Sequence, residues 1–391
     1  MLPKGMCNHF SLAWPWWFVG MFGLTGLLCS NVLGAQKRVR AELDFPPLPG
    51  YVVLKCDLHI HTVFSDGLVW PTVRVEEAWR EGLDAIALSD HIELLPHRED
   101  VSTNLNRSYE VARRAADELG IILIRGTEIT RDDPPGHLNA LFLKDVIALR
   151  ADDYREALRV AKAQGAFVFW NHPGWRQPDH QTVWYDEIEE AFTRGWLQGI
   201  EIVNGEEFDP IAYRWAERKT LTILGNSDAH DPMGLEFDPA ADEHPPMTLV
   251  LATDRSEQAL HDGLLARRTA VCSRNMLFGS KAWLGRIFDK SVEIRNPKVV
   301  MVPGRSVLLQ VFNRSPLNFI LGGGGGESEI AVPEETVIYA GKTSLMEIKA
   351  GRGAALGTRT IELPLHVANL KVGPKDDLIA RWKIEVTFTS P

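Results

Sequence analysis

Short apolar runs recur along the first 290 residues, and most of them end in a turn that carries polar side chains. Seven runs have the length and continuous apolar character of strands buried on both faces, as in parallel sheets. They are residues 52–58, 84–88, 121–124, 138–143, 166–170, 199–203 and 221–224. Segments with the helical spacing of apolar residues lie between most of them, at residues 71–81, 107–119, 154–164, 185–194 and 211–219. This alternation predicts βα units and a parallel α/β barrel.

The pattern changes after about residue 292. Short segments follow in which apolar and polar residues alternate, at residues 299–302, 306–312, 336–339, 344–349, 358–363 and 381–387. Such a pattern favours a small β-sandwich. The expected organisation is a linker at residues 36–50, a barrel domain at 51–289 and a β-sandwich at 290–391. The β-sandwich is expected to pack on the barrel or on another subunit of an oligomer.

Residues 1–35 have the pattern of an export signal. Lys4 precedes an apolar stretch at residues 11–28, and small residues at 32–35 offer a cleavage site. The mature chain would then begin near Gln36. The alternative is an uncleaved segment that tethers the protein to a membrane, because the stretch approaches the ~20 residues that span a bilayer.

The composition limits the classes of protein that remain. A chain of 391 residues with 45% hydrophobic content can bury a large core. Its net charge of -10 and pI near 5.7 argue against a nucleic-acid partner, because nucleic-acid-binding domains usually display a basic surface. The four cysteines form no recognisable disulfide framework or zinc knuckle. Cysteine is therefore not the expected chemistry.

Side chains of the kinds that bind metal ions gather where the predicted strands end. His59 and His61 stand two apart at the end of the first strand, so their imidazoles share one face. In a parallel barrel the carboxyl ends of the strands form the reactive face. The candidate ligands are His59, His61, Asp66, His91, Glu128, His137, His172, Asp228 and His230.

Nitrogen and carboxylate ligands without thiolates fit Zn²⁺, Mn²⁺ or Fe²⁺. The candidates exceed the ~four ligands that one tetrahedral zinc needs, which implies more than one ion. A carboxylate such as that of Glu128 can bridge two ions, and two ions ~3.5 to 4 Å apart activate a shared hydroxide. Hydrolysis is therefore the expected type of reaction.

The order of these motifs resembles that of the polymerase-and-histidinol-phosphatase (PHP) family. The motifs are His59-Ile60-His61, Ser65-Asp66-Gly67, Ser89-Asp90-His91, Glu128, His172-Pro173 and Asp228-Ala229-His230. The resemblance covers roughly residues 52–275. It implies a distorted (β/α)7 TIM-like barrel that holds two or three divalent metal ions and hydrolyses phosphate esters.

The residues around the motifs resemble the branch of bacterial organophosphate phosphodiesterases, at residues 69–75, 134–137, 169–175 and 225–228. That likeness implies a small phosphodiester as the substrate and a periplasmic or extracellular location. Asp66 stands where histidinol phosphatases have His, which leaves the choice between two and three metal ions open.

The resemblance also assigns roles to the candidate residues. It implies three metal positions, held by His59, His61, Glu128 and Asp228, by Glu128 with His137 or His172, and by Asp66, His91 and His230. Glu128, Asp228 and His230 are expected to take part in catalysis, in which a metal-bridging hydroxide attacks phosphorus. An alkoxide or phenoxide would then leave.

Contacts with the substrate are expected from Arg107, Asn171 and Trp175. Arg107 would neutralise the charge of the phosphodiester, and Trp175 would line an apolar pocket for the leaving group. Asp57 and Asp90 neighbour ligand histidines and are candidate acceptors that orient an imidazole. Salt bridging at the rim of the barrel is the alternative for both.

Three other functions remain open at the level of the sequence. The same barrel supports a phosphomonoesterase or a hydrolase of carbamates or amides. A third alternative comes from another class, a non-catalytic module that metal ions stabilise for binding. The nearly complete set of ligands argues against this last alternative.

Overall fold

The computed structural model describes residues 39–237, 243–323 and 329–391. Residues 40–391 form one compact unit. The predicted export segment at residues 1–35 lies outside the described residues. No helix in the described part of the chain combines the length and the apolar character needed to span a bilayer.

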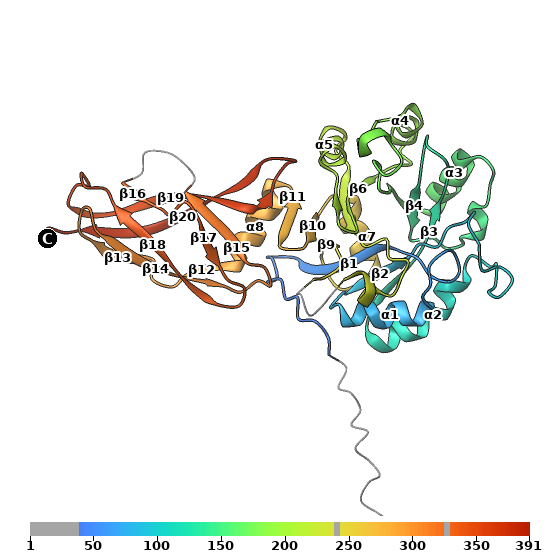
Figure 1. Cartoon of the computed structure of the whole chain (residues 1–391), viewed down its shortest axis with the longest axis horizontal. Helices are drawn as coiled ribbons and strands as arrows, with labels where there is room; N and C mark the ends of the chain where they lie inside the picture. The colour runs from blue at the N-terminus through green and yellow to red at the C-terminus, as the bar shows by residue number, and fades with distance from the viewer. Residues whose placement is uncertain (1–38, 238–242, 324–328) are drawn as a thin grey trace, which may run out of the picture. The chain divides into compact units, whose positions relative to one another are not determined.

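Seven strands form the wall of an α/β barrel (Figure 1). In spatial order they are β1 (Val52–Ile60), β2 (Ala85–Leu88), β3 (Ile122–Ile129), β4 (Leu138–Leu141), β5 (Phe167–Trp170), β6 (Gly199–Asn204) and β8 (Thr222–Asn226). A bridge between Ile60 and Ala229 joins the end of β1 to the residues after β8 and closes the ring. The predicted barrel and its seven strands are confirmed.

One strand of the wall runs in the opposite direction. β4 is antiparallel to both β3 and β5, whereas the other wall strands that form ladders pair in parallel. The expectation of parallel strands was therefore wrong for β4. Residues 130–137 connect β3 to β4 directly, without the crossover helix that a parallel connection needs.

The helices begin and end where local sequence signals place them. They are α1 (Pro71–Arg80), α2 (Arg107–Leu119), α3 (Tyr154–Gln164), α4 (Asp186–Thr193), α5 (Pro210–Lys219), α6 (Met233–Glu236), α7 (Glu257–Leu265) and α8 (Lys281–Ser291), with 3-10 turns η1 (Ile147–Leu149) and η2 (Pro178–His180). Gly120 and Gly165 end α2 and α3 in the left-handed conformation, with φ of 69° and 84°. The five predicted helices lie within one residue of α1 to α5.

Three strands that the sequence did not predict extend the sheet beyond β1. β9 (Met247–Ala252) pairs antiparallel with β1, and β10 (Thr269–Ser273) and β11 (Met276–Gly279) follow it as an antiparallel meander. A further two-residue strand, β7 (Glu207–Phe208), pairs with β6.

The C-terminal strands form two facing sheets, as the alternating pattern predicts. They are β12 (Val292–Ile294), β13 (Lys298–Met301), β14 (Ser306–Asn313), β15 (Phe319–Gly323), β16 (Ile330–Ala331), β17 (Thr336–Ile338), β18 (Thr343–Ala350), β19 (Gly357–Lys371) and β20 (Asp377–Phe388). One sheet has the order β12-β14-β18-β16, and the other joins β13, β20 and β19 with β15 and β17. Leu309 on β14 and Leu365 on β19 are fully buried in the same core.

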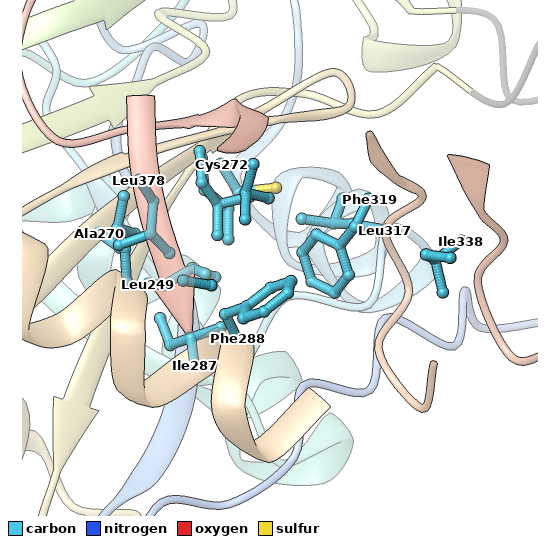
Figure 2. Packing of buried hydrophobic residues seen from close by; sticks show 14 of the residues in the cluster. Leu249, Ala270, Cys272, Ile287, Phe288, Leu317, Phe319, Ile338 and Leu378 are labelled. Atoms are coloured by element: carbon cyan, nitrogen blue, oxygen red, sulfur yellow. The ribbon is translucent and has the colours of Figure 1, made fainter. Parts of the chain in front are cut away.

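A continuous hydrophobic core connects this β-rich region to the barrel (Figure 2). Phe288 on α8 lies with its ring centroid 5.1 Å from that of Phe319 on β15, while Leu249 and Ala270 contribute from β9 and β10. The main sheet is also continuous, because β11 pairs in parallel with β19. The boundary predicted at residue 289 falls within α8, and the chain on both sides of it contributes to this core.

A second apolar cluster draws residues from most strands of the wall and therefore fills the inside of the barrel. Leu58, Phe167, Phe169 and Leu224 are all fully buried in it. The ring of His59 lies against this cluster, with its centroid 6.4 Å from that of Phe169. The polar residues at the carboxyl end of β1 therefore lie on a closely packed apolar core.

Candidate metal centre

The end of β1 brings two imidazoles to one point. His59 and His61 are fully buried, and their Nε2 atoms lie 3.1 Å apart. This is the shared face expected from side chains two apart. Gly67 packs so closely against the backbone of His61 that a Cβ atom there would lie 2.7 Å from its carbonyl carbon. Only glycine fits at this position, next to Asp66.

The two imidazoles form a first group with Glu128 and Asp228. Glu128 Oε2 lies 2.8 Å from His59 Nε2 and 3.2 Å from His61 Nε2. Asp228 Oδ1 lies 3.0 Å from each of the same nitrogen atoms. Asp228 takes a left-handed backbone conformation, with φ of 56°, which is uncommon for non-glycine residues although Asp adopts it more readily than most.

Glu128 belongs also to a second group, with His137 and His172. Its Oε1 atom lies 2.5 Å from His137 Nδ1, and the rings of His137 and His172 are 5.0 Å apart. The structure thus brings both histidines to Glu128, where the family resemblance implied one or the other. The antiparallel turn from β3 to β4 places His137 here, because it returns the chain directly to the end of β3.

The third group contains His61, Asp66, His91 and His230. Asp66 Oδ1 lies 3.4 Å from both His91 Nε2 and His230 Nε2. His61 joins this group in addition to the three residues that the resemblance implied. All nine candidate ligands therefore lie in one cluster, and shared members, Glu128 and His61, link its three groups.

The chemistry of the cluster fits divalent metal ions. Buried atoms without a hydrogen-bond partner in the described part of the chain include Asp66 Oδ1, Asp228 Oδ1 and His137 Nε2. Buried polar atoms are normally hydrogen-bonded, and an unpaired one costs about 1 to 3 kcal/mol. A cation would satisfy these converging oxygen and nitrogen lone pairs. The absence of thiolates from the set is compatible with Zn²⁺, Mn²⁺ or Fe²⁺.

The electrostatics of the cluster favour ionised carboxylates. Burial raises the pKa of Asp228 and of Glu128, but the neighbouring imidazoles outweigh burial and hold both pKa values well below their usual range. For His61, burial lowers the pKa, while Asp228 and Glu128 outweigh that effect and raise it to about 9. The carboxylates thus create a negative field that stabilises positive charge.

Glu201 on β6 orients His59 from behind. Its Oε1 atom accepts a hydrogen bond from His59 Nδ1 at 2.9 Å and from Asn226 Nδ2 at 2.8 Å. Since Nδ1 carries the proton, the lone pair of Nε2 faces the first group. The sequence did not single out this residue. The sequence feature that could have identified it is a charged residue inside an otherwise apolar strand. In the structure Glu201 is 1% exposed.

Asp57 and Asp90 act on the ligands less directly than expected. Asp57 accepts hydrogen bonds from the backbone N–H of His59 and from Ser227. Asp90 accepts from the Ser65 hydroxyl at 2.9 Å, and His61 Nδ1 lies 3.3 Å from that hydroxyl. Neither carboxylate contacts an imidazole itself. The prediction that Asp57 or Asp90 accepts a hydrogen bond directly from a ligand histidine was therefore wrong.

Arg74 on α1 is a second residue that the sequence did not point out. Its side chain is fully buried, and its Nε atom donates to the carbonyl of His61 at 2.9 Å. Its two terminal nitrogens donate to the carbonyls of Ala229, His230 and Asp231 at 2.8 to 3.0 Å. The guanidinium therefore joins the loop after β1 to the loop after β8. The sequence feature that could have identified Arg74 is its position on the apolar face of the predicted helix.

A cavity of about 310 Å³ opens over the three groups and gives a substrate access to them. Trp175 and Arg176 stand on its wall, with the Arg176 guanidinium carbon 4.5 Å from the Trp175 ring centroid. Trp175 therefore lies where a substrate contact was expected. Arg176 is the one Lys or Arg among the described residues that line this cavity.

The other two expected substrate contacts lie elsewhere. Arg107 is not among the residues that line the cavity, and its guanidinium pairs with Glu110 at 3.1 Å on the exposed side of α2. Asn171 is 1% exposed, and its side chain exchanges hydrogen bonds with Asn139 beneath the site. Sequence proximity to a motif was not enough to place either side chain in the cavity.

The chain forms a seven-stranded barrel, and nine histidines and carboxylates cluster at one end of it. These two features place it in the class of barrel proteins whose strand ends can hold metal ions. The PHP domain model matches residues 57–220 of this chain. A solved structure from Bacteroides vulgatus, described as a two-domain protein containing a predicted PHP-like metal-dependent phosphoesterase, is 41% identical. The likeness covers 90% of this chain and 100% of that chain, with a TM-score of 0.83. The chain belongs to the PHP family.

Two other relatives share less with this chain. A 5'-3' exoribonuclease of Haemophilus influenzae is 38% identical over 76 residues, which is 19% of this chain and 23% of that protein. The chain therefore matches less than a quarter of the length of that enzyme. A putative metal-dependent phosphoesterase of Bifidobacterium adolescentis is 20% identical, with a TM-score of 0.34 over 45% of this chain and 87% of that chain.

Proposed function

We propose that this protein is a metal-dependent hydrolase of phosphodiesters. The observation that carries the proposal is the linkage of three ligand groups through Glu128 and His61 beneath an open cavity. Membership of the PHP family and the description of the Bacteroides relative support phosphate esters as the substrate class. Divalent ions held by these groups would supply Lewis acidity and lower the pKa of a water molecule.

The protein's own residues prepare this site in two ways. Glu201 fixes the tautomer of His59, so that its Nε2 lone pair is available to an ion. Arg74 holds the loops that carry His61 and His230 at a fixed distance from each other. Ligands that are held in place before an ion binds lose little conformational freedom on binding.

The charge of the cavity favours a diester over a monoester. Arg176 is the one permanently charged cation on its described wall, and its side chain is half exposed. A phosphodiester carries one negative charge, whereas a phosphomonoester carries nearly two at neutral pH. Beside the ions that the metal groups would hold, this one guanidinium, which also pairs with Asp132 at 3.4 Å, adds at most a single positive charge, as a singly charged diester would need. The net charge of -10 further favours a small molecule over a polyanion.

The test is hydrolysis of bis(p-nitrophenyl) phosphate and of p-nitrophenyl phosphate by the full chain, with Mn²⁺ or Zn²⁺ added and bound metal measured in parallel. We expect two or more ions per chain and faster turnover of the diester. His59→Ala should lose both bound metal and activity. His366→Ala is the matched control, because His366 lies on β19 and pairs with Asp377.

Each other result assigns a different function. Preference for the monoester would make the protein a phosphatase, and bound metal without either activity would favour a carbamate or amide hydrolase. Full activity of His59→Ala would contradict the proposed site. We also propose that residues 1–35 export the protein to the periplasm or outside the cell, which fractionation of the expressed full chain tests.

A further inference from the structure

A second cavity adjoins the metal centre. It has a volume of about 560 Å³ and is lined by residues 172–175, 180–181, 201–204 and 207–211, and we call it the Phe208 cavity. His172, Trp175 and Asn204 line both this cavity and the one over the metal groups. A group bound at the metal centre can therefore extend past Trp175 into the Phe208 cavity without leaving the protein surface.

The walls of the Phe208 cavity are largely apolar. Ile202 and Val203 of β6 form a buried floor, at 1% and 2% exposure. Phe208 and Ile211 are half-buried, and Trp175 is 49% exposed. Aromatic and aliphatic side chains that remain exposed next to a polar site offer apolar contact to a ligand.

The charged groups of this cavity are all acidic, apart from the imidazoles of His172 and His180. No Lys or Arg is found among the described residues that line it, whereas Glu201, Glu207 and Asp209 are. Asp209 Oδ1 caps the start of α5 by accepting from the backbone N–H groups of Ile211 and Ala212. Glu207 stands exposed at the rim, where its carboxylate can face an occupant.

The metal-centre cavity differs in charge. Arg176 lies on its wall, and every described carboxylate that lines it belongs to one of the three ligand groups. A negative phosphoryl group is therefore favoured there and disfavoured in the Phe208 cavity. A second phosphate or a carboxylate in the Phe208 cavity would lie near the exposed carboxylate of Glu207, with no Lys or Arg on the described wall to offset it, and like charges brought together weaken binding.

We propose that the Phe208 cavity receives one ester arm of the substrate. This arm is an apolar organic group without negative charge, and a positive charge on it strengthens binding. The inference rests on the proposed phosphodiesterase function and narrows its substrate class. It disfavours a polynucleotide that extends along this path, because its next phosphate would have to lie in or beside this cavity.

The first test is binding, and it does not depend on turnover. Phenyltrimethylammonium, benzyl alcohol and benzoate are compared by ligand-observed NMR with the full chain. We expect the cation and the alcohol to bind and benzoate not to bind. Glu207→Lys should reverse the order of the two charged probes. Glu206→Lys is the matched control, because Glu206 pairs with Arg274 and does not line the cavity.

The second test is turnover of p-nitrophenyl diesters whose other arm is phenyl, 4-trimethylammoniophenyl or 4-carboxyphenyl. We expect kcat/KM for the carboxylate arm to be roughly 10-fold lower than for phenyl, and Glu207→Lys to remove that difference. Equal kcat/KM for the three arms, equal binding of benzoate, or the same shift in Glu206→Lys would overturn the inference. If no diester is hydrolysed, the proposed function fails, and the binding test alone decides for or against the cavity.

Discussion

Nδ1 of His59 donates a hydrogen bond to Oε1 of Glu201 at 2.9 Å, and both side chains are almost completely excluded from solvent. Glu201 receives three further donors, from Asn226, Asn204 and the backbone N–H of His172. With donors on every side, this carboxylate can only accept. The pair therefore fixes which nitrogen of His59 faces the metal groups.

Replacement of Glu201 by Gln should weaken metal binding. The amide nitrogen of Gln would have to face one of the four donors, so that one buried hydrogen bond is lost and His59 is no longer held in one tautomer. We expect metal affinity to fall about 10- to 100-fold, as for other residues that orient a ligand. Titration against a competing chelator measures it.

Glu207→Gln is the matched control for that variant, because Glu207 is exposed and lies outside the ligand groups. Equal metal affinity in Glu201→Gln and the unaltered protein would show that the tautomer of His59 is fixed by other contacts.

Removal of the Arg74 guanidinium should destabilise the fold. Arg74→Met leaves the buried carbonyl of His61 without the donor that the structure gives it, and it removes one of the two donors of the carbonyls of Ala229 and His230. An unpaired buried acceptor costs about 1 to 3 kcal/mol, and the hydrogen bonds lost at Ala229, His230 and Asp231 add to it, so we expect the free energy of unfolding to fall by about 3 kcal/mol. Urea denaturation followed by circular dichroism measures the change.

The control for Arg74 is Arg80→Met on the same helix, where the side chain is 61% exposed and approaches Glu76 only at 4.0 Å. A surface arginine of this kind contributes little to stability. A similar loss in both variants would argue that helix α1 itself, and not the carbonyl contacts, sets the effect.

Arg176 and Arg107 should differ in their effect on catalysis. Arg176→Ala removes the one Lys or Arg from the described wall of the metal-centre cavity, and we expect KM for a diester to rise roughly 10-fold with a smaller change in kcat. Arg107→Ala should leave both constants nearly unchanged, since Arg107 pairs with Glu110 on the outside of α2. Steady-state kinetics of the two variants measures these constants. A larger rise of KM in Arg107→Ala than in Arg176→Ala would support Arg107 as the substrate contact, as predicted from the sequence.

The two cysteines of the described chain should not react with thiol reagents in the folded protein. Burial raises the pKa of Cys272 to about 12, and burial, reinforced by the nearby Asp84, raises that of Cys56 well above its usual value. Because the thiolate is the reactive form, neither thiol should titrate below pH 9.

Cys7 and Cys29 are replaced by Ser for this experiment, so that only the buried thiols remain. We expect no rapid labelling by dithionitrobenzoate at pH 8 and full labelling in guanidinium chloride. Rapid labelling of the folded protein would show that β1 or β10 opens far more often than a buried core strand should.

The sequence indicated the candidate ligands because the residue types at strand ends can be read from short stretches of the chain. The spacing of His59 and His61 sets their common face, and the alternation of strands and helices places strand ends at one rim. The remaining seven candidates were found by residue type at or near those ends, except that His137 precedes the antiparallel strand β4, and the structure gathers all of them. The same reasoning failed for Arg107 and Asn171, because closeness in sequence does not determine where a side chain points.

What the sequence determined by itself was periodicity: seven strands, five helices, the alternating texture of the C-terminal sheets and the residue types at each strand end. Only the tertiary structure decided the direction of β4, the core shared by Phe288 and Phe319, and the partners of Glu201 and Arg74. The physical reason is the separation along the chain of the residues that interact. Periodicity is a local property of the backbone, whereas hydrogen bonds between residues more than 100 positions apart exist only once the barrel has closed.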